Sequence, residues 1–296
     1  MLNSALIKDA ARTIGFDLCG VARCQKFTAE ADFLKQWIEA GNGLGLDYLS
    51  RNIDKRADVT QLVEGAQSVI VCGVSYKNAY SDGYPTSCRQ KIASYALTTD
   101  YHITIKRMLQ QLCTMLKEVC PTLTGRIFTD SAPVFEKRYA VEAGLGWIGR
   151  QSLLVTPQFG TFVLLGVAIV SEQCDEYDSP LQGVGCGECR RCIDACPNGA
   201  VIDRHIDTRK CISRATIERQ GEEIVPLHGW IFGCDECQNC CPYNAKAPIA
   251  INPLVAPTFD PVTIDWQKID EAEFALRFAN TPISRSSLER VLSNLD

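Results

Sequence analysis

The first part of the chain alternates between two kinds of hydrophobic pattern. Apolar residues at helical spacing predict a helix over residues 4–14, with Ser4 as its N-cap and Gly15 as its C-terminal stop. The apolar run at residues 68–76, SVIVCGVSY, has the length and the β-branched residues of a buried strand. Further expected elements are a strand at 16–21, a helix at 28–40, a helix opened by Asp100, Tyr101 and His102, a strand at 126–129, a helix started by Pro133, and a hairpin and long strand up to residue 170. This alternation predicts an α/β or α+β domain with helices packed against a sheet.

One aspartate stands at a position that suits catalysis. Asp130 directly follows the strand expected at residues 126–129, and α/β folds place chemistry beyond the carboxyl ends of their strands. Burial there would raise the pKa of its carboxyl group, so that it could donate a proton near neutral pH. An aspartate that caps a helix or lies in a solvated turn is the more common explanation of such a position. The residues alone therefore leave both interpretations open.

A cysteine-rich segment begins at residue 186. Its first part reads Cys186-x-x-Cys189-x-x-Cys192-x-x-x-Cys196-Pro197, which is the ligand spacing of 4Fe-4S clusters in two-cluster bacterial ferredoxins. Its second, broken copy consists of Cys211 followed by Cys234-x-x-Cys237-x-x-Cys240-Cys241-Pro242. Zinc and disulfides are alternative uses of cysteine, but zinc usually takes four ligands and this register supplies eight. The spacing favours two iron-sulfur clusters.

In such ferredoxins the fourth cysteine of each motif serves the other cluster, because the Cys-Pro step turns the chain away from the first cube. Applied to this chain, the exchange assigns Cys186, Cys189, Cys192 and Cys241 to one cluster and Cys196, Cys211, Cys234 and Cys237 to the other. Cys240 and Cys241 compete for the last position. Cys240 continues the spacing, whereas Cys241 precedes the proline, and we favour Cys241.

Changes in composition divide the chain into three parts. Residues 1–176 form the alternating α/β part, and residues 177–247 contain the cysteine motifs. Residues 248–296 begin with several prolines, become acidic, and carry two weak helical patterns at 270–278 and 284–295. This last part is too short for a further folded domain, so we expect it to wrap back onto the body.

The composition excludes several classes of protein. With 296 residues and 46% hydrophobic content, the chain can bury a large core and is not disordered. Eight of its 16 cysteines are assigned to the clusters, and the N-terminus lacks the apolar core of an export signal. No apolar stretch approaches the roughly 18–20 residues of a membrane helix. We therefore expect a cytoplasmic protein with no membrane partner.

The net charge of -5 argues against a general attraction to nucleic acid. A local basic surplus is present between Thr86 and Arg126, where the basic residues outnumber Asp100 and Glu118. These basic residues are Arg89, Lys91, Lys106, Arg107, Lys117 and Arg126. A solvated helix face explains this surplus as well as a nucleic-acid contact does.

Several motifs together resemble those of the epoxyqueuosine reductases, which make queuosine in transfer RNA. The motifs are the two-cluster segment, the stretch FTDSAPVFEKRYAVEAGLGWIGRQSLLV, the Asp-Tyr-His sequence at 100–102, and the segments 54–62, 92–107, 211–213 and 233–238. The resemblance covers nearly the whole chain. It implies an α+β protein, in which a cobalamin-binding domain of nitroreductase-like topology is followed by a two-cluster ferredoxin-like domain.

The resemblance also implies a reaction. Electrons from the two clusters would reduce base-off cobalamin to cob(I)alamin, which removes the epoxide oxygen of epoxyqueuosine at the wobble position of tRNA as water. Asp130 matches the proton donor of the family. The segments that contact cobalamin in the family contain Arg56, Tyr95, Asp130, Arg138, Ser152, Gly233 and Asp235. His102 is either a polar group near the substrate or a residue of a first helical turn.

The partners implied by the resemblance are a tRNA with a queuosine-type anticodon and an external electron donor, and we expect a monomer. The chain departs from the family pattern at Tyr243, where tryptophan is usual, and at Arg150, where lysine is usual. It also ends at residue 296 without the helical repeats of many members, which concerns tRNA affinity more than the chemistry. The alternatives are a cobalamin-dependent reductase of a small molecule, similar to the reductive dehalogenases, and a ferredoxin-like carrier, with flavin as a rival cofactor.

Overall fold

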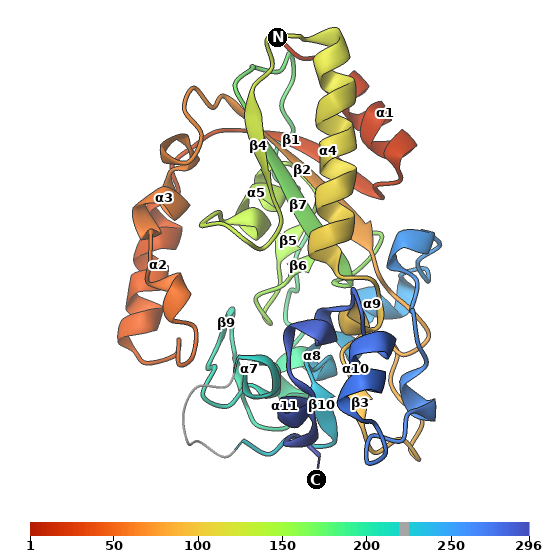
Figure 1. Ribbon diagram of the computed structural model, residues 1–296. Helices are drawn as coiled ribbons and strands as arrows, with labels where there is room; N and C mark the ends of the chain where they lie inside the picture. Colours follow the sequence, from red (N-terminus) through yellow and green to blue (C-terminus); the bar gives the residue numbers. More distant parts are fainter. Residues whose placement is uncertain (219–224, 296) are drawn as a thin grey trace.

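The computed structural model describes residues 1–218 and 225–295, and Figure 1 shows an upper half that contains a sheet above a lower half of short helices. The sheet has four strands in the order β1-β2-β7-β4, and every neighbouring pair is antiparallel. Its strands are β1 (Leu18–Arg23), β2 (Ser68–Ser75), β7 (Val163–Val170) and β4 (Gly125–Phe128). The predicted mixture of helices and sheet is confirmed.

Both faces of the sheet are covered. Ile70, Cys72 and Val74 of β2 pack on one face with α1 (Ser4–Ile14) and α4 (Tyr101–Val119). The alternate residues Val69 and Val71 pack on the other face, toward α5, because successive side chains of a strand point to opposite sides. The helices of this second side are α5 (Glu136–Glu142), α2 (Thr28–Glu39) and α3 (Ile53–Ala57), with α2 and α3 beside each other at the left of Figure 1.

Helix α4 approaches the sheet closely at Gly166 of β7. A Cβ atom at this position would lie 2.4 Å from Ile105 Cγ2 and 2.8 Å from Leu109 Cδ1, so only glycine allows this approach. The helix buries Ile105, Met108, Leu109, Leu112 and Leu116. Ile103, in the first turn of the helix, is by contrast 51% exposed.

The structure contains most of the predicted helices and strands, but several of their boundaries differ from the prediction. The helix 4–14 is confirmed, with Gly15 at φ +107° as its end, but the N-cap is Asn3. The Asn3 side chain accepts a hydrogen bond from Leu6 N–H, so the prediction of Ser4 was one residue late. The prediction that Pro133 starts a helix is also wrong, because α5 begins at Glu136.

The lower half combines the cysteine segment with pieces of chain from both sides of it. Strand β10 pairs in parallel with β3, which precedes α4 in the sequence. Ile92, Phe232, Trp266 and Phe278 meet in one core, so the last part of the chain packs against both earlier parts. The boundaries expected at 176 and 247 remain a prediction.

The remaining elements are short. Those of the sheet-containing half are η1 (Asp47–Leu49), η2 (Val59–Gln61), β5 (Trp147–Ile148) and β6 (Leu154–Val155). Those of the lower half are β3 (Lys91–Ile92), η3 (Ser94–Leu97), α6 (Arg191–Asp194), β8 (Val201–Ile202), β9 (His205–Ile206), α7 (Ile212–Ile217), β10 (Trp230–Phe232), α8 (Glu236–Asn239), α9 (Pro242–Lys246), η4 (Pro253–Val255), η5 (Pro261–Thr263), α10 (Glu271–Arg277), η6 (Pro282–Arg285) and α11 (Leu288–Leu292). None of the described helices combines the length and apolar character required to cross a bilayer.

Candidate active site

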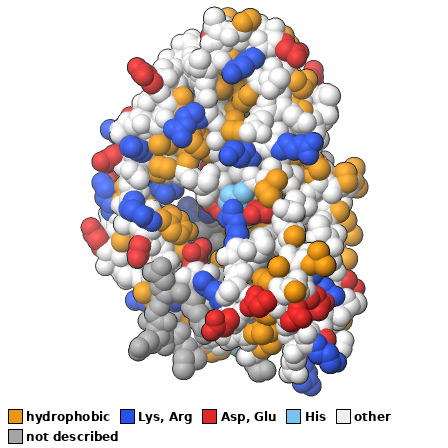
Figure 2. All heavy atoms as spheres, in the orientation of Figure 1, with side chains coloured by type: hydrophobic (Ala, Val, Ile, Leu, Met, Phe, Trp, Pro, Cys, Tyr) orange, Lys and Arg blue, Asp and Glu red, His pale blue; other side chains and the backbone are white. Residues whose placement is uncertain are grey.

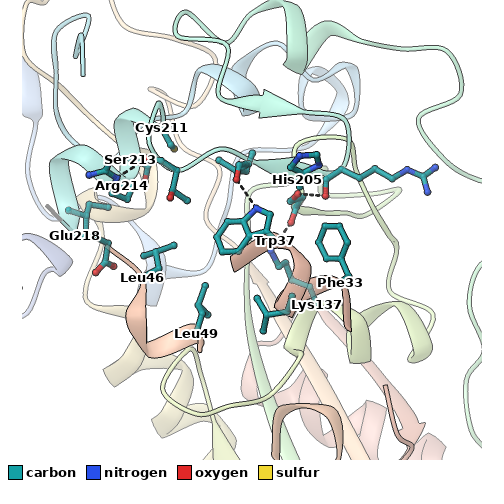
Figure 3. A pocket seen from close by; sticks show the side chains of 16 residues that line it. Phe33, Trp37, Leu46, Leu49, Lys137, His205, Cys211, Ser213, Arg214 and Glu218 are labelled. Carbon is teal, nitrogen blue, oxygen red and sulfur yellow. Dashed lines mark hydrogen bonds between the residues drawn. The ribbon is translucent and has the colours of Figure 1, made fainter. Parts of the chain in front are cut away.

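A pocket of about 400 Å³ lies between α2, η1 and the segment from β9 to α7 (Figure 3). Its apolar wall is formed by Phe33, Trp37, Leu46 and Leu49, and its polar lining includes Lys137, Ser152, Cys211 and Glu218. Trp37 Nε1 donates a hydrogen bond to the carbonyl of Ile206 at 2.9 Å, which joins α2 to β9. A pocket of this size and mixed lining is typical of small-molecule binding.

Lys137 is fixed at the edge of this pocket. Its Nζ donates a hydrogen bond to the carbonyl of Ser152 at 2.6 Å, and Ser152 has a left-handed backbone with φ +64°. Ser152 Oγ in turn donates to the carbonyl of Arg204 at 2.7 Å. Protein surrounds the Lys137 side chain although water still reaches it through the pocket, and this partial burial lowers its pKa.

Asp130 lies in the loop between β4 and α5, and its carboxylate is held by a tyrosine. The phenol of Tyr101 donates a hydrogen bond to Asp130 Oδ2 at 2.6 Å, and the Asp130 N–H donates to Glu136 Oε1 at 2.9 Å. The Asp130 backbone is left-handed, with φ +51°. Aspartate is one of the few residues that tolerate this conformation, so the loop presents the carboxylate in a defined direction.

Two premises of the sequence argument for Asp130 are wrong. The residue is exposed and not buried, and the sheet is antiparallel, so the rule for parallel strand ends does not apply. The neighbouring carboxyl group of Glu136 has a strongly displaced pKa. Burial and the nearby charge of Asp130 raise the pKa of Glu136 to about 8, so Glu136 holds a proton at neutral pH.

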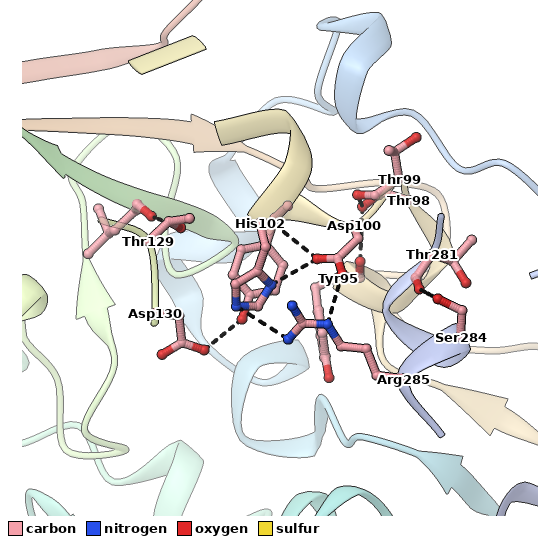
Figure 4. A network of polar contacts seen from close by, with 12 residues as sticks. Tyr95, Thr98, Thr99, Asp100, His102, Thr129, Asp130, Thr281, Ser284 and Arg285 are labelled. Carbon is pink, nitrogen blue, oxygen red and sulfur yellow. Dashed lines mark hydrogen bonds and ion pairs between the residues drawn. The ribbon is translucent and has the colours of Figure 1, made fainter. Parts of the chain in front are cut away.

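The aromatic surroundings of Asp130 come from η3 and the first turn of α4. Tyr95 meets Tyr101 edge to face at 6.2 Å, and Tyr101 lies against the His102 ring at 4.1 Å. Burial and the charge of Asp130 raise the pKa of Tyr101, so its phenol stays protonated and remains a donor. Figure 4 shows Asp130, His102 and Tyr95 facing a common space.

Arg56 of α3 has an unpartnered group at this site. Its Nη1 donates a long hydrogen bond of 3.5 Å to the carbonyl of Val134, and its Nε is buried without a partner among the described residues. Burial lowers the pKa of Arg56, although Tyr48, Glu136 and Asp130 favour its charge. A buried donor without an acceptor is costly, and a bound polar ligand could supply one.

Two other expected cofactor contacts already have protein partners. Arg138 forms ion pairs with Glu30 of α2 and Glu142 of α5, which links these two helices. Asp235 is buried, and its carboxylate accepts hydrogen bonds from Ser94 N–H at 2.6 Å and Gln238 Nε2 at 2.9 Å. Burial raises the pKa of Asp235 to about 6. The side chains of Arg138 and Asp235 therefore stabilise contacts between neighbouring secondary-structure elements.

Gly233 lies against η3. A Cβ atom there would come within 2.5 Å of the Ala93 Cβ and 3.4 Å of Tyr95 Cε1, and φ is +69°. Only glycine fits both the space and the backbone, so Gly233 sets the position of Tyr95. Of the expected contacts, Asp130 is exposed, Ser152 lines the pocket, and Arg56 and Tyr95 are partly exposed. Arg138, Gly233 and Asp235 instead contact neighbouring elements.

The motif cysteines form two neighbourhoods. The thiol of Cys192 is influenced by the charges of Cys186, Cys189 and Cys241, and that of Cys237 by Cys234, Cys211 and Cys196. Cys240 lies near Cys192 and Cys241, and burial raises its pKa to about 11. All sixteen cysteines are free of disulfides.

The geometry of these thiols differs from that of a single-ion site. Within residues 1–218 and 225–295, no three His, Cys, Asp or Glu side chains converge as the ligands of one metal ion do. In a 4Fe-4S cube each iron has its own thiolate, so the ligands stand apart.

A buried polar network that the sequence did not reveal docks the cysteine segment on the sheet. Asn244 of α9 accepts a hydrogen bond from Thr161 N–H at 2.6 Å and donates to the Gln238 carbonyl at 2.7 Å. Lys77, which follows β2 and is 3% exposed, donates to the carbonyls of Asn244 and Ala247 at the end of α9. These contacts fix the helix that begins directly after Cys241.

The charged side chains around the hollow between the two halves are unevenly distributed. Figure 2 shows Lys and Arg side chains gathered above and to the left of the hollow, and Asp and Glu side chains gathered below it. Lys106 and Arg107 on α4 are exposed, as expected for either a solvated face or a nucleic-acid contact.

Two parts of the sequence match described families. Residues 56–131 match the family described as Epoxyqueuosine reductase QueG, DUF1730, and residues 185–244 match the 4Fe-4S double cluster binding domain. The epoxyqueuosine reductase of Cyclobacterium marinum is 36% identical over 302 residues, which cover 99% of this chain and 96% of that protein. The epoxyqueuosine reductase of Pseudomonas aeruginosa is 34% identical over 304 residues, which cover 98% of this chain and 82% of that protein.

Solved structures agree with these matches. The crystal structure of an epoxyqueuosine reductase with a tRNA-Tyr epoxyqueuosine-modified tRNA stem loop has a TM-score of 0.87 at 25% identity, covering 98% of this chain and 79% of that chain. The structure of the epoxyqueuosine reductase from Streptococcus thermophilus has a TM-score of 0.85 at 26% identity, with the same coverage. The resemblance inferred from the motifs is confirmed, and the chain belongs to the epoxyqueuosine reductase family.

Proposed function

We propose that this protein reduces epoxyqueuosine to queuosine at the wobble position of tRNA, using cobalamin and two 4Fe-4S clusters. The observation that carries the proposal is the placement of the Asp130 carboxylate, held by Tyr101 at 2.6 Å, in the open space between the two halves of the molecule. The name of its relatives and the tRNA stem loop bound in a similar structure support the choice of substrate.

The residues bordering the pocket suit cobalamin. Cobalamin presents many amide groups, and Lys137 and Ser152 offer polar atoms beside an apolar wall that includes Trp37. Arg56, which is not part of the pocket lining, has an Nε without a partner among the described residues. The cofactor is larger than the pocket, so it would also need the adjoining hollow. When bound, cobalamin supplies a strongly nucleophilic reduced cobalt for attack on the epoxide.

The cysteines favour the crossed assignment of the clusters. Cys186, Cys189, Cys192 and Cys241 would hold one cluster, and Cys196, Cys211, Cys234 and Cys237 the other, in line with their two neighbourhoods. Cys211 also lines the pocket, so the second cluster would lie beside the cofactor. We retain the division at residues 176 and 247 and the nitroreductase-like topology of the first part as proposals.

Asp130 would transfer a proton to the substrate, and Tyr101 would hold Asp130 in position. Conversion of an epoxide to an alkene takes up two electrons and two protons and releases the oxygen as water. Asp130 would donate a proton from its carboxyl group to the departing oxygen, as a general acid. Tyr101 would keep the carboxylate in place before and after the transfer, because its own proton is retained.

The tRNA would approach from the basic side of the hollow. The Lys and Arg side chains above it can neutralise phosphates, while the acidic lower half would repel other parts of the backbone. Because the substrate is tRNA, we propose a cytoplasmic location. We also propose an external electron donor and a monomeric state.

The decisive experiment is anaerobic turnover. The reconstituted protein is incubated with cobalamin, a strong reductant and epoxyqueuosine-containing tRNA, and nucleosides are followed by mass spectrometry. Conversion to queuosine that falls at least about a hundredfold in Asp130→Asn, but not in the exposed control Asp9→Asn, supports the proposal. Cobalamin binding with full iron content but no queuosine would instead favour a reductase of a small molecule.

A second experiment on the reconstituted protein decides whether Cys240 or Cys241 is the last cluster ligand. Cys241→Ser and Cys240→Ser are compared for iron content and for the electron paramagnetic resonance signal of each reduced cluster. Loss of one cluster in Cys241→Ser alone supports the proposed ligand set, and loss in Cys240→Ser alone reverses it.

A further inference from the structure

An arginine from the C-terminal segment reaches the first turn of α4 (Figure 4). Arg285 of η6 donates from Nε to Asp100 Oδ2 at 2.9 Å, and its Nη1 lies 3.4 Å from His102 Nε2. The other oxygen of Asp100, Oδ1, lies 2.8 Å from His102 Nδ1 and 3.0 Å from the His102 backbone nitrogen. Asp100 and Arg285 together therefore occupy both ring nitrogens of His102.

We propose that Arg285 is a positioning residue of the active site, which holds Asp100 and His102 so that the neighbouring Tyr101 keeps its hydrogen bond to Asp130. The proposal extends the function proposed above to a residue 155 positions away from Asp130 in the sequence. It assigns to His102 a neutral ring with its proton on Nδ1 and a lone pair on Nε2.

The charges around His102 support this state. Asp100 accepts a hydrogen bond from Nδ1–H, whereas the guanidinium of Arg285 can only donate and so needs a lone pair on Nε2. Tyr101 covers the ring face, and Asp130 and Tyr95 lie beyond Tyr101. Burial works to raise the pKa of Asp100, but hydrogen bonds from His102 and the charge of Arg285 outweigh it, and the pKa is lowered. Asp100 thus stays ionised and keeps both partners.

The same contacts set the position of the tyrosine. Asp100 is the N-cap of α4, so its carboxylate also orders the turn that carries Tyr101 and His102. Without Arg285, one oxygen of Asp100 loses its side-chain partner, and the turn loses its tie to η6. A displacement of about 1 Å of a catalytic group can cost about a hundredfold in rate.

The position of Arg285 allows this role to be tested without unfolding the protein. Its side chain is 54% exposed, whereas the neighbouring Ile283 and Phe278 are fully buried and anchor the segment. Arg277 provides a matched control, because it lies in the same segment, is partly exposed and pairs with a carboxylate, Glu273, away from the site.

The first test needs no turnover. The protein has three histidines, so selective ¹⁵N labelling of the full-length, cluster-containing protein gives few ring signals, which His102→Gln assigns. We expect Nδ1–H and unprotonated Nε2 for His102 in wild type and in Arg277→Met, and a displaced Nε2 signal in Arg285→Met, because the guanidinium partner of Nε2 is lost. Arg285→Lys should restore much of the wild-type signal. An unchanged His102 spectrum in Arg285→Met would overturn the proposal.

The second test separates positioning from binding. Arg285→Met should lower kcat about ten- to a hundredfold with KM for tRNA little changed, and Arg277→Met should leave both unchanged. A raised KM with unaltered kcat would make Arg285 a tRNA contact instead and would overturn the positioning role. If the wild type produces no queuosine but the His102 signals change as expected, the proposed function fails while the structural role of Arg285 stands.

Discussion

The Tyr101 hydroxyl lies 2.6 Å from Oδ2 of Asp130 and joins the start of α4 to the loop after β4. Tyr101 belongs to α4 and Asp130 to the loop after β4. They meet because α4 packs against β7 of the sheet. An exposed carboxylate keeps one direction only when a partner holds it, and the Tyr101 hydroxyl holds that of Asp130. The hydrogen bond is therefore a means of preorganising Asp130 before substrate arrives.

Tyr101→Phe should lower turnover by about tenfold. The substitution keeps the ring contact with His102 and removes only the hydroxyl that holds Asp130. KM for tRNA should change little, because the tyrosine acts on the acid group and not on the RNA. Single-turnover kinetics with epoxyqueuosine-containing tRNA would measure the effect. Tyr80→Phe is the control, since it removes a similar tyrosine-aspartate hydrogen bond, to Asp260, outside the site; equal losses in both variants would contradict the prediction.

Glu136→Gln should stabilise the protein at alkaline but not at acidic pH. The pKa of Glu136 is raised from 4.5 to about 8, so the native state binds its proton more tightly than the unfolded state does. The native state therefore loses stability as the pH rises from about 4.5 to about 8. A tenfold difference in proton affinity between the two states corresponds to about 1.4 kcal/mol, but water reaches this site, so we expect a gain of only about 1–2 kcal/mol.

Urea unfolding of the cobalamin-free protein at pH 5 and pH 8.5 measures this difference. Glutamine retains an oxygen that can accept the Asp130 N–H, so the hydrogen bond of the loop is kept. Glu39→Gln replaces an exposed carboxylate at the end of α2 and should have little effect at either pH. A gain in Glu136→Gln that is equal at both pH values would show that the charge is not responsible.

Gly160→Ala should lose the cluster that we propose Cys241 to bind. A Cβ atom at Gly160 would lie 1.9 Å from Asn244 Oδ1, and the backbone has φ +61°. Asn244 would be displaced, and with it the helix that follows Cys241. We expect iron content to fall from about eight to about four atoms per chain. Gly183→Ala has a similar backbone, at φ +70°, with open space around it, and it should keep its iron; equal iron loss in both variants would indicate backbone strain alone.

Lys77→Met should destabilise the contact between the sheet and the cysteine segment. The buried Lys77 Nζ serves two carbonyls at the end of α9 and forms an ion pair with Asp82 at 3.1 Å. Its removal leaves these groups without their donor, which should cost about 2–4 kcal/mol. Urea unfolding monitored by far-ultraviolet circular dichroism would measure the loss. Lys246→Met removes an exposed lysine of α9 itself and should cost less than about 0.5 kcal/mol.

Features with a local cause were predictable from the sequence. Helix α1 ends at Gly15 because glycine adopts the left-handed backbone of a helix terminus, and β2 is buried because its apolar run is continuous. The cysteine register depends on spacing within a few residues, so it indicated two clusters without any knowledge of the fold. The family motifs indicated Asp130 as the proton donor in the same way, and this role stays a prediction, although the burial expected at this position is absent.

Contacts between distant segments were decided by the tertiary structure alone. Arg285 meets Asp100 across 185 positions, and Lys77 meets Asn244 across 167. β3 pairs with β10 although the sheet-forming strands β4 and β7 lie between them in the sequence. The spacing of apolar residues, with a period of two in strands or 3.6 in helices, predicts single elements but not such pairs. The pairs depend on how whole elements pack. The sequence by itself thus determined the helices, the buried strands and the thiolate spacing, while packing determined which side chains surround Asp130.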